Sequence, residues 1–461
     1  MHIRLPGRHV LPACDAHPEL PAAGPRRRPH WLTLRRVRTC AHFALFGYMV
    51  FLGIYVVRRF GPHDAMIPSL GIDFAPTWRA AWLAAHGRAL DVWHVAALHA
   101  AREQALPAMH GMQVEPLWQH PPGMLLIVTP LGWLPYVFAA LLWIGGSYAL
   151  FAAICHAIVQ RRSASLCACA FPGAFLAAIA GQNSLLTAAT AGFGLLLLQR
   201  RPIAAGICFG ILTLIVPQLA VLFPLALLCA AQWRALAAWA VTVGASTAIT
   251  MLAFGPDVWI DFMSGLTGAY RIIDTGHASL TRMPTAFALA TLADWPPIVA
   301  YTLQAASIVF AIGAVCYAWR GSCTYALRAA TLTCASLLVS PYLRDYDLTW
   351  YGILIAWYAR YAFALGWHRF DREWLALLWL LPLAGSRIAD YLSIQFMPLV
   401  TAATLALLVA RIARERHDAP CLPDAHDSAT DTGFTHAGRP HHAAPRFHRL
   451  DRQLLPHGSR H

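Results

Sequence analysis

The chain has 461 residues, of which 58% are hydrophobic and only 12% are charged. A soluble globular domain carries about 25% charged residues, so this composition excludes an ordinary soluble protein and indicates a membrane protein. All 35 basic residues are arginines, and they give a net charge of +13. They lie in the terminal tails and in short loops between apolar runs, which is typical of orientation signals and not of nucleic-acid binding.

The two ends of the chain are rich in Pro, Arg and His and lack apolar periodicity. We therefore predict disordered basic tails at residues 1–39 and 413–461, flanking a membrane domain at residues 40–412. The first apolar run begins near Cys40, and no small-residue cleavage site follows it. We expect it to be an anchor and not a signal peptide.

About twelve apolar runs divide the membrane domain, so the predicted fold class is an all-α polytopic membrane protein with about twelve transmembrane helices. Several runs are shorter than the ~20 residues that cross a bilayer squarely, which predicts broken or half-length helices. The runs are 40–57, 137–159, 164–180, 184–199, 202–216, 219–231, 235–254, 297–319, 326–340, 347–365, 374–389 and 396–411.

One further run, 123–134, is short and bounded by prolines. If it does not cross the membrane, the arginine-bearing short loops all fall on the side of the N-terminal tail, as the positive-inside rule requires. We therefore predict a re-entrant or surface-lying segment and cytoplasmic termini, in a bacterial cytoplasmic (inner) membrane.

With this topology, the unusual polar clusters fall on the external side. A transporter tends to place such residues at the bilayer midplane, so the pattern favours an enzyme that works at the surface on a lipid-held substrate. The clusters are Asp73, Glu115 with His120, Gly181-Gln182-Asn183, Pro217-Gln218, residues 255–296 and Ser340–Asp347.

Asp73 lies in the long first external loop. Trp78 and Trp82 follow it at helical spacing, and a second short amphipathic helix is expected around residues 95–106. Tryptophan on such faces favours the membrane interface, so the loop is predicted to carry short interfacial helices. Asp73 is either a structural helix cap or a functional carboxylate.

The other external clusters offer groups that could bind a substrate. Gln182 and Asn183 form either a turn that satisfies helix ends or a site that recognises sugar hydroxyls. Gln218 follows a proline that breaks an apolar stretch, and such a break at membrane depth usually lines a cavity. His120 is either a solvated loop residue or a substrate contact.

The turn at residues 340–347 concentrates charge beside two spans, where charges usually have a function. Arg344 and Asp345 could pair with each other, or Arg344 could bind a phosphate through its planar donor fork. Asp347 completes this cluster. Rival phosphate partners in the long external loop are Arg271, His277 and Arg282.

In this order and spacing, the motifs resemble glycosyltransferase family 87, the polyprenyl-phosphate-mannose-dependent mannosyltransferases of the membrane-embedded C superfamily. The matching pieces are Asp73-Phe74, Pro121-Pro122 through Pro130-Leu131 to Pro135, Gly181-Gln-Asn-Ser-Leu-Leu186, Arg201-Pro with Ala205-Gly206, Pro217-Gln218, Phe254-Gly-Pro with Trp259 and Phe262, and Ser340-Pro-Tyr with Asp345-Tyr-Asp347.

The resemblance implies transfer of a sugar, mannose or a similar hexose, from a polyprenyl-phosphate donor to a hydroxyl of a lipid or glycan acceptor on the external face, with inversion. It places the catalytic carboxylate at Asp73, with Arg344 or Arg282 stabilising the leaving phosphate. The donor supplies its own leaving group, so no cofactor is expected. The sequence offers no clear metal-ligand cluster either.

One position departs from the family pattern. Family members usually have a lysine before the Pro-Gln pair, and this chain has Val216. Either another cation contacts the lipid phosphate, or the donor differs, or the chain is a catalytically impaired relative. The alternative from another class is a polytopic transporter or lipid flippase.

Overall fold

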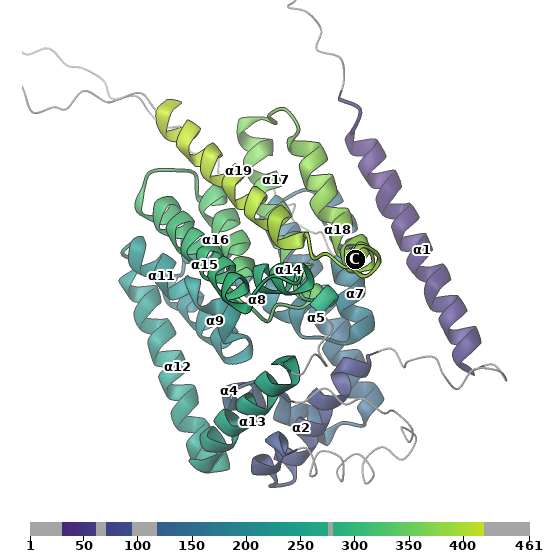
Figure 1. Ribbon diagram of the computed structural model, residues 1–461, viewed down its shortest axis with the longest axis vertical. Helices are drawn as coiled ribbons and strands as arrows, with labels where there is room; N and C mark the ends of the chain where they lie inside the picture. The colour runs from purple at the N-terminus through teal and green to yellow at the C-terminus, as the bar shows by residue number, and fades with distance from the viewer. Residues whose placement is uncertain (1–29, 61–70, 95–117, 275–279, 419–461) are drawn as a thin grey trace, which may run out of the picture. The chain divides into compact units, whose positions relative to one another are not determined.

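The computed structural model describes residues 30–60, 71–94, 118–274 and 280–418. This part of the chain is helical throughout and contains no strand (Figure 1). Six of its helices are long and apolar enough to cross a membrane. They are α1 (Leu34–Phe60), α5 (Tyr136–Val159), α12 (Trp233–Phe254), α15 (Pro297–Arg320), α18 (Asp371–Leu392) and α19 (Met397–Asp418).

The remaining apolar runs form shorter helices, so the all-helical membrane fold is confirmed, while the number of spans stays a prediction. Each predicted run coincides with one helix or with consecutive helices. The shorter helices are α6 (Arg162–Cys169), α7 (Pro172–Ala180), α8 (Ser184–Leu198), α9 (Pro202–Ile215), α10 (Pro217–Ala220), α11 (Leu222–Cys229), α16 (Tyr325–Val339) and α17 (Trp350–Leu365).

Broken helices, expected in general for the shorter runs, occur at two prolines, and the break at Pro217 is the one that the sequence predicted. α6 and α7 meet at 48°, and together they are apolar enough to count as a seventh candidate span. Phe171 is extended at this bend because the residue before a proline disfavours the helical region. Pro217 opens α10 in the same way, and Val216 has left the helical region at the end of α9.

The segment at 123–134 forms α4 (Pro122–Val128) and the 3-10 helix η4 (Thr129–Trp133), and it is not among the candidate spans. It packs on α2 (Ala75–Ala85), with Gly132 against the backbone of Ala81. The predicted helix after Asp73 is therefore present. Its Trp78 is only 4% exposed and donates to the carbonyl oxygen of Leu134, so this side chain packs against protein.

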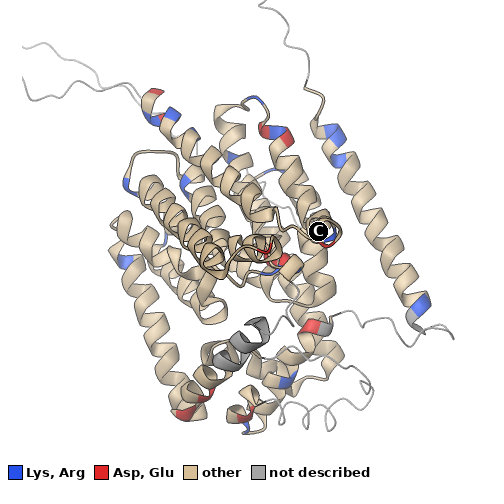
Figure 2. Ribbon diagram, viewed as in Figure 1, with Lys and Arg blue, Asp and Glu red and all other residues tan. Residues whose placement is uncertain are grey.

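The arginine-bearing turns gather at one end of the bundle, uppermost in Figure 2. There Arg161 lies 4.0 Å from the ring centre of Phe363, and Arg416 lies 4.0 Å from that of Tyr317. We call this the arginine end. Among the described parts of the predicted external clusters, residues 72–74 and 345–349 both pack against α7.

Short helices complete the other end. They are the 3-10 helices η1 (Ile72–Phe74), η2 (Ala89–Trp93), η5 (Leu280–Arg282) and η6 (Asp345–Thr349), with α13 (Asp257–Asp274) and α14 (Ala286–Leu292). The membrane domain is slightly longer than predicted, because α1 begins at Leu34 and α19 ends at Asp418. The second short helix expected around residues 95–106 lies outside the described residues.

Candidate active site

Asp73 lies in η1, which two contacts hold against the bundle. The backbone N–H of Gly71 donates to the carbonyl oxygen of Ile179 at 2.7 Å, and the hydroxyl of Tyr136 donates to that of Gly71 at 3.2 Å. These bonds fix the start of η1 against the end of α7 and the start of α5. The carboxylate of Asp73 is thereby placed on a short turn with supported ends.

The turn at 181–183 packs directly on η1. Gly181 has φ +82°, a conformation that L side chains rarely adopt, and it ends α7. A Cβ there would lie 2.9 Å from the Cα of Gly71 and 2.9 Å from the Cβ of Phe74. Only glycine allows this approach, so the Gly181 turn and the Asp73 turn form one unit.

The carboxylate of Asp73 is not a helix cap. The residue that caps α2 is Phe74, no side-chain cap hydrogen bond is made, and the second residue of the helix is Pro76. Asp73 is half-buried, and within the described ranges no hydrogen bond or ion pair engages its carboxylate. The structural alternative for Asp73 is therefore wrong, and the carboxylate is available to a ligand.

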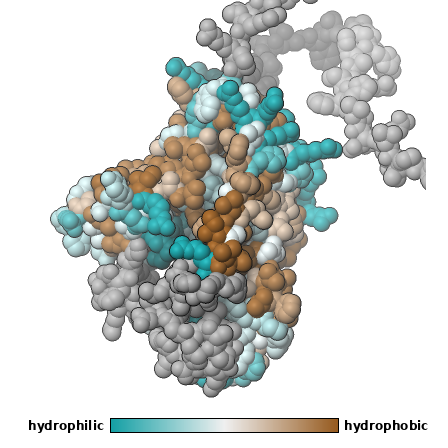
Figure 3. All heavy atoms as spheres, turned by 90° about the vertical axis from the view of Figure 1, so that its right-hand side faces the viewer, coloured by the Kyte–Doolittle hydropathy of each residue, from teal (hydrophilic) through white to brown (hydrophobic). Residues whose placement is uncertain are grey.

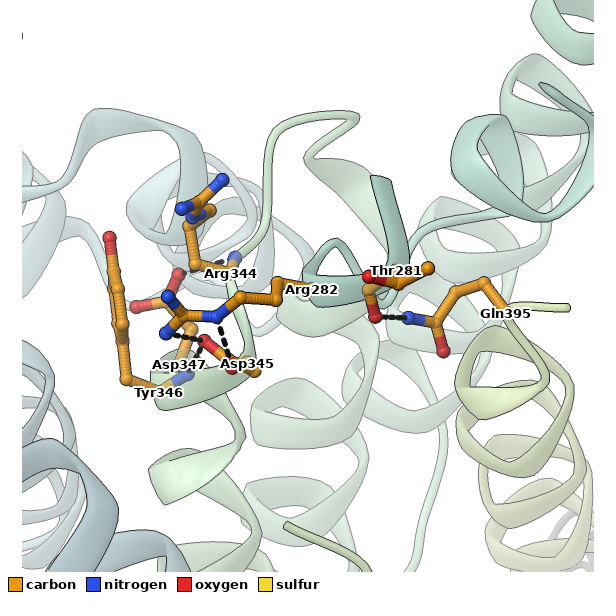
Figure 4. A network of polar contacts seen from close by, with 7 residues as sticks. All are labelled: Thr281, Arg282, Arg344, Asp345, Tyr346, Asp347 and Gln395. Carbon is orange, nitrogen blue, oxygen red and sulfur yellow. Dashed lines mark hydrogen bonds and ion pairs between the residues drawn. The ribbon is translucent and has the colours of Figure 1, made fainter. Parts of the chain in front are cut away.

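Arg282 and Asp345 form the strongest ion pair at this end (Figure 4). The guanidinium donates from Nε to Oδ2 at 2.8 Å and from Nη2 to Oδ1 at 3.0 Å. Such a bidentate pair is both strong and geometrically specific. The alternative in which Asp345 pairs with Arg344 is therefore wrong. Asp345 pairs with Arg282, and this pair joins η5 to η6.

Arg344 and Asp347 form the other half of this network. The backbone N–H of Arg344 donates to Oδ2 of Asp347 at 3.0 Å. Asp347 is 8% exposed, and burial raises the pKa of its carboxyl from 3.8 to about 7, against the effect of this hydrogen bond. The guanidinium of Arg344 points away from the Arg282–Asp345 pair and bonds to no described side chain.

Electrostatic interactions connect Asp73 to this network. The hydrogen bond with Asp345 raises the pKa of Arg282, and burial lowers it. The negative charges of Asp345 and Asp73 raise this pKa further. Burial raises the pKa of Tyr346, and the charges of Asp347 and Asp73 raise it further. These charge interactions indicate that the carboxylate of Asp73 lies in the neighbourhood of η5 and η6.

Gln395, which sequence reasoning missed, supports this site from behind (Figure 4). Its side-chain amide is 1% exposed and donates from Nε2 to the carbonyl oxygen of Thr281 at 2.7 Å. Its Oε1 accepts from the backbone N–H of Met397 at 3.2 Å, so the start of α19 positions η5 and Arg282. An amide among apolar neighbours was the only signal in the sequence.

His120 ties three segments together. Its Nδ1 lies 3.2 Å from the carbonyl oxygen of Ile215, and its Nε2 lies 3.4 Å from Nδ2 of Asn183. A neutral ring that donates from Nδ1 and accepts at Nε2 satisfies both contacts, and burial lowers the pKa of His120 to about 4. Both ring nitrogens are engaged within the protein, and substrate contact stays a prediction for His120 and Asn183.

Other predicted residues are not drawn into this network. Gln182 is half-buried and Gln218 is exposed, and the side chains of both bond to no described residue. Val216, where the family pattern has lysine, is a buried side chain, 4% exposed. Glu115, His277 and the side chain of Arg271 lie outside what the structure describes. No group of three or more metal-binding side chains occurs among the described residues.

Comparison with known proteins identifies the family. No curated protein and no solved structure matches the chain. The family model described as Glycosyltransferase family 87 matches residues 118–341. This stretch contains His120, the Gly181 turn, Pro217-Gln218 and Arg282, and it ends inside the 340–347 turn, before Arg344 and Asp345. This match identifies residues 118–341 as a glycosyltransferase family 87 region and indicates that the protein is a glycosyltransferase.

Proposed function

We propose that the protein transfers a hexose, mannose or a similar sugar, from a polyprenyl-phosphate donor to a hydroxyl of a lipid or glycan acceptor. The observation that carries this proposal is the pairing of charges in the site. The carboxylate of Asp73 has no hydrogen bond or ion pair among the described residues, and its charge acts on Arg282 and Tyr346. The charge of Arg344 acts on Asp347, while its guanidinium donates to no described side chain. A carboxylate without a partner and a guanidinium with unused donors suit transfer from a sugar phosphate.

In the proposed reaction, Asp73 removes the proton of the acceptor hydroxyl as its oxygen attacks the anomeric carbon. The bond from that carbon to the phosphate oxygen breaks, and its electron pair leaves with the polyprenyl phosphate. Such a general base contributes typically about 10²–10⁴-fold. Direct displacement inverts the anomeric centre, so a β-linked donor gives an α-linked product. The step needs no cofactor, because the lipid phosphate is already a leaving group.

Arg344 is the cation that we assign to the leaving phosphate. Arg282 is held by Asp345 through two bonds, whereas the planar fork of Arg344 is uncommitted. A group that meets the charge developing in the transition state contributes more than one that binds the ground state. Arg344 thereby takes the role that the resemblance gives to the lysine replaced by Val216.

We place this reaction at the external face of a bacterial inner membrane, in a fold of about twelve spans with cytoplasmic termini. The gathering of arginines at one end of the bundle supports this orientation. The Asp73 end would then face outward, where interfacial helices of the first loop would meet lipid-linked substrates. Membrane lipids are the expected surroundings.

The test is transfer from a radiolabelled polyprenyl-phosphate sugar by purified Asp73→Asn. We expect a loss of about 10²–10⁴-fold with unchanged thermal stability. Asp257→Asn, at the exposed start of α13, is the matched control and should remain active. Full activity of Asp73→Asn would remove this carboxylate from the mechanism. A folded wild-type protein that transfers no sugar from any polyprenyl phosphate would instead support the impaired relative that Val216 suggests.

A further inference from the structure

An apolar groove lies between α1 and the rest of the bundle. It has a volume of about 450 Å³, and its walls come from α1, α5, α6, α17 and α18. Small side chains such as Ala164, Ala359 and Ala376 leave the space open, and Phe171 and Trp379 lie along its wall. Water does not occupy an apolar space of this kind, so in a membrane we expect a lipid acyl chain to fill it.

α1 is attached to the bundle on both sides of this groove. Near its start, Trp31 donates to Glu373 at 2.8 Å and Arg372 donates to the carbonyl oxygen of Leu32 at 3.3 Å. Further along, the ring of Tyr48 stacks on Phe175 with centres 3.9 Å apart. Between these attachments α1 packs on α6 and buries Ala41, so α1 forms a fixed wall of the groove.

The mouth of the groove is basic. Arg372 lines it, Arg36 and Arg38 flank the lining residue Val37, and Arg161 lies over the lining residue Phe363. Within the described residues, none of these four guanidinium groups has a carboxylate partner. The two acids beside Arg372 are engaged elsewhere, Glu373 by Trp31 and His30 and Asp371 by Arg411. On the face that carries α1, the upper margin is hydrophilic and brown apolar surface lies below it (Figure 3).

We propose that this groove binds one anionic glycerophospholipid, with its phosphate among the arginines of the rim and an acyl chain along α1 and α17. Basic pockets between transmembrane helices bind anionic lipid headgroups, and guanidinium groups bind phosphate oxygens in pairs. The chemistry of the groove matches both ends of such a lipid. The site lies at the arginine end, apart from the Asp73 site.

The donor's own polyprenyl chain fits the groove less well. A donor whose phosphate contacts Arg344 would offer only hydrocarbon here, and the arginines of the rim would have no anion to bind. A phospholipid of the leaflet at the arginine end supplies both the phosphate and the chain. The proposal therefore does not depend on the identity of the sugar donor.

The experiment measures lipid binding to the purified full chain in a non-ionic detergent. Phosphatidylglycerol and phosphatidylcholine with identical acyl chains are titrated, and bound lipid is followed by native mass spectrometry and thermal stability. We expect phosphatidylglycerol to bind more tightly and to raise the melting temperature more. Each arginine near an anionic lipid surface contributes a similar share of the binding free energy. The double variant Arg38→Gln, Arg372→Gln should therefore bind phosphatidylglycerol about 30-fold more weakly.

Two further variants separate lipid binding from general damage. Ala376→Trp fills the groove and should abolish retention of phosphatidylglycerol with the rim intact. The matched controls are Arg234→Gln and Ala240→Trp, both exposed on α12, and neither should change binding. Asp73→Asn should bind the lipid normally, which separates this inference from the proposed reaction.

Either of two results would overturn the proposal. One is equal binding of the two phospholipids by the wild-type protein. The other is a polyprenyl phosphate that co-purifies with the protein and is lost on Ala376→Trp, which would assign the groove to the donor's chain.

Discussion

Arg282 and Asp345 are 63 positions apart in the sequence, yet two hydrogen bonds of 2.8 and 3.0 Å join their side chains. The pair connects η5, which precedes α14, to η6, whose N-cap residue is Arg344. Because both guanidinium and carboxylate are partly buried, the bond holds the two turns in one relative position. The Arg282–Asp345 pair therefore also fixes the position of Arg344, although Arg344 takes no part in the pair.

Loss of this pair should disorganise the site. Arg282→Gln and Asp345→Asn are each expected to lower transfer up to about 100-fold, since small displacements of positioned groups have effects of that size. The double variant should be little worse than either single one, because the residues act as a unit. The exposed pair of Arg88 and Asp91 provides the control, and Arg88→Gln should leave transfer unchanged. Fully additive losses would show that the two residues act separately.

The helices could be predicted from the sequence because hydropathy is a local property. Each apolar run became a helix, and the breaks at Pro172 and Pro217 follow from the restricted backbone at and before proline. The segment at 123–134 forms two short helices, and its re-entrant or surface-lying position stays a prediction. What spacing could not determine is how many of the shorter helices span the bilayer.

The candidate site could be predicted only in part, because its contacts are long-range. The sequence singled out Arg282 and Asp345 but offered only the neighbouring Arg344 as a possible partner of Asp345, since adjacent charges suggest a local partner. Gln395 was not found at all, because its role depends on how α19 docks beside η5. The availability of Asp73 could not be inferred either, since a carboxylate before a helix usually caps it.

Arg344 should affect catalysis without affecting stability. Arg344→Gln is expected to lower kcat about 10²–10³-fold, the effect of removing one donor to a developing charge. Arg344→Lys should retain part of the rate, because it keeps the charge but loses the planar fork. Thermal melting should change little, since its guanidinium bonds to no described side chain. The control is Arg234→Gln, at the exposed start of α12, and wild-type activity in Arg344→Gln would place the phosphate elsewhere.

Two buried groups should make stability depend on pH in opposite directions. The pKa of Asp347 rises from 3.8 to about 7 on folding. Its contribution to the free energy of unfolding is therefore greatest below pH 3.8 and is lost as pH rises towards 7. The pKa of His120 falls from 6.5 to about 4, so its contribution is complete above 6.5 and is lost as pH falls towards 4. In the wild-type protein the two slopes partly cancel.

Single variants should show separately how each group makes the melting temperature depend on pH. Asp347→Asn is expected to give a melting temperature that rises with pH between about 4 and 6.5, because only the histidine then titrates. His120→Gln should give the reverse trend, a melting temperature that falls as pH rises towards about 7. Thermal melts across this range at constant ionic strength measure both. Two variants with the slope of the wild-type protein would show that neither group is buried as the structure has it.

Gly181 should be required for both stability and transfer. Its φ of +82° disfavours any side chain, and a Cβ would lie 2.9 Å from atoms of Gly71 and Phe74. Gly181→Ala is therefore expected to destabilise the fold by about 1–3 kcal/mol and to move η1, so transfer should fall more than the folded fraction does. Gly145→Ala is the matched control, because a Cβ there meets no atom within 4 Å and α5 accommodates alanine. If the two variants have the same melting temperature and the same rate of sugar transfer, the close approach of the Gly181 turn does not position Asp73.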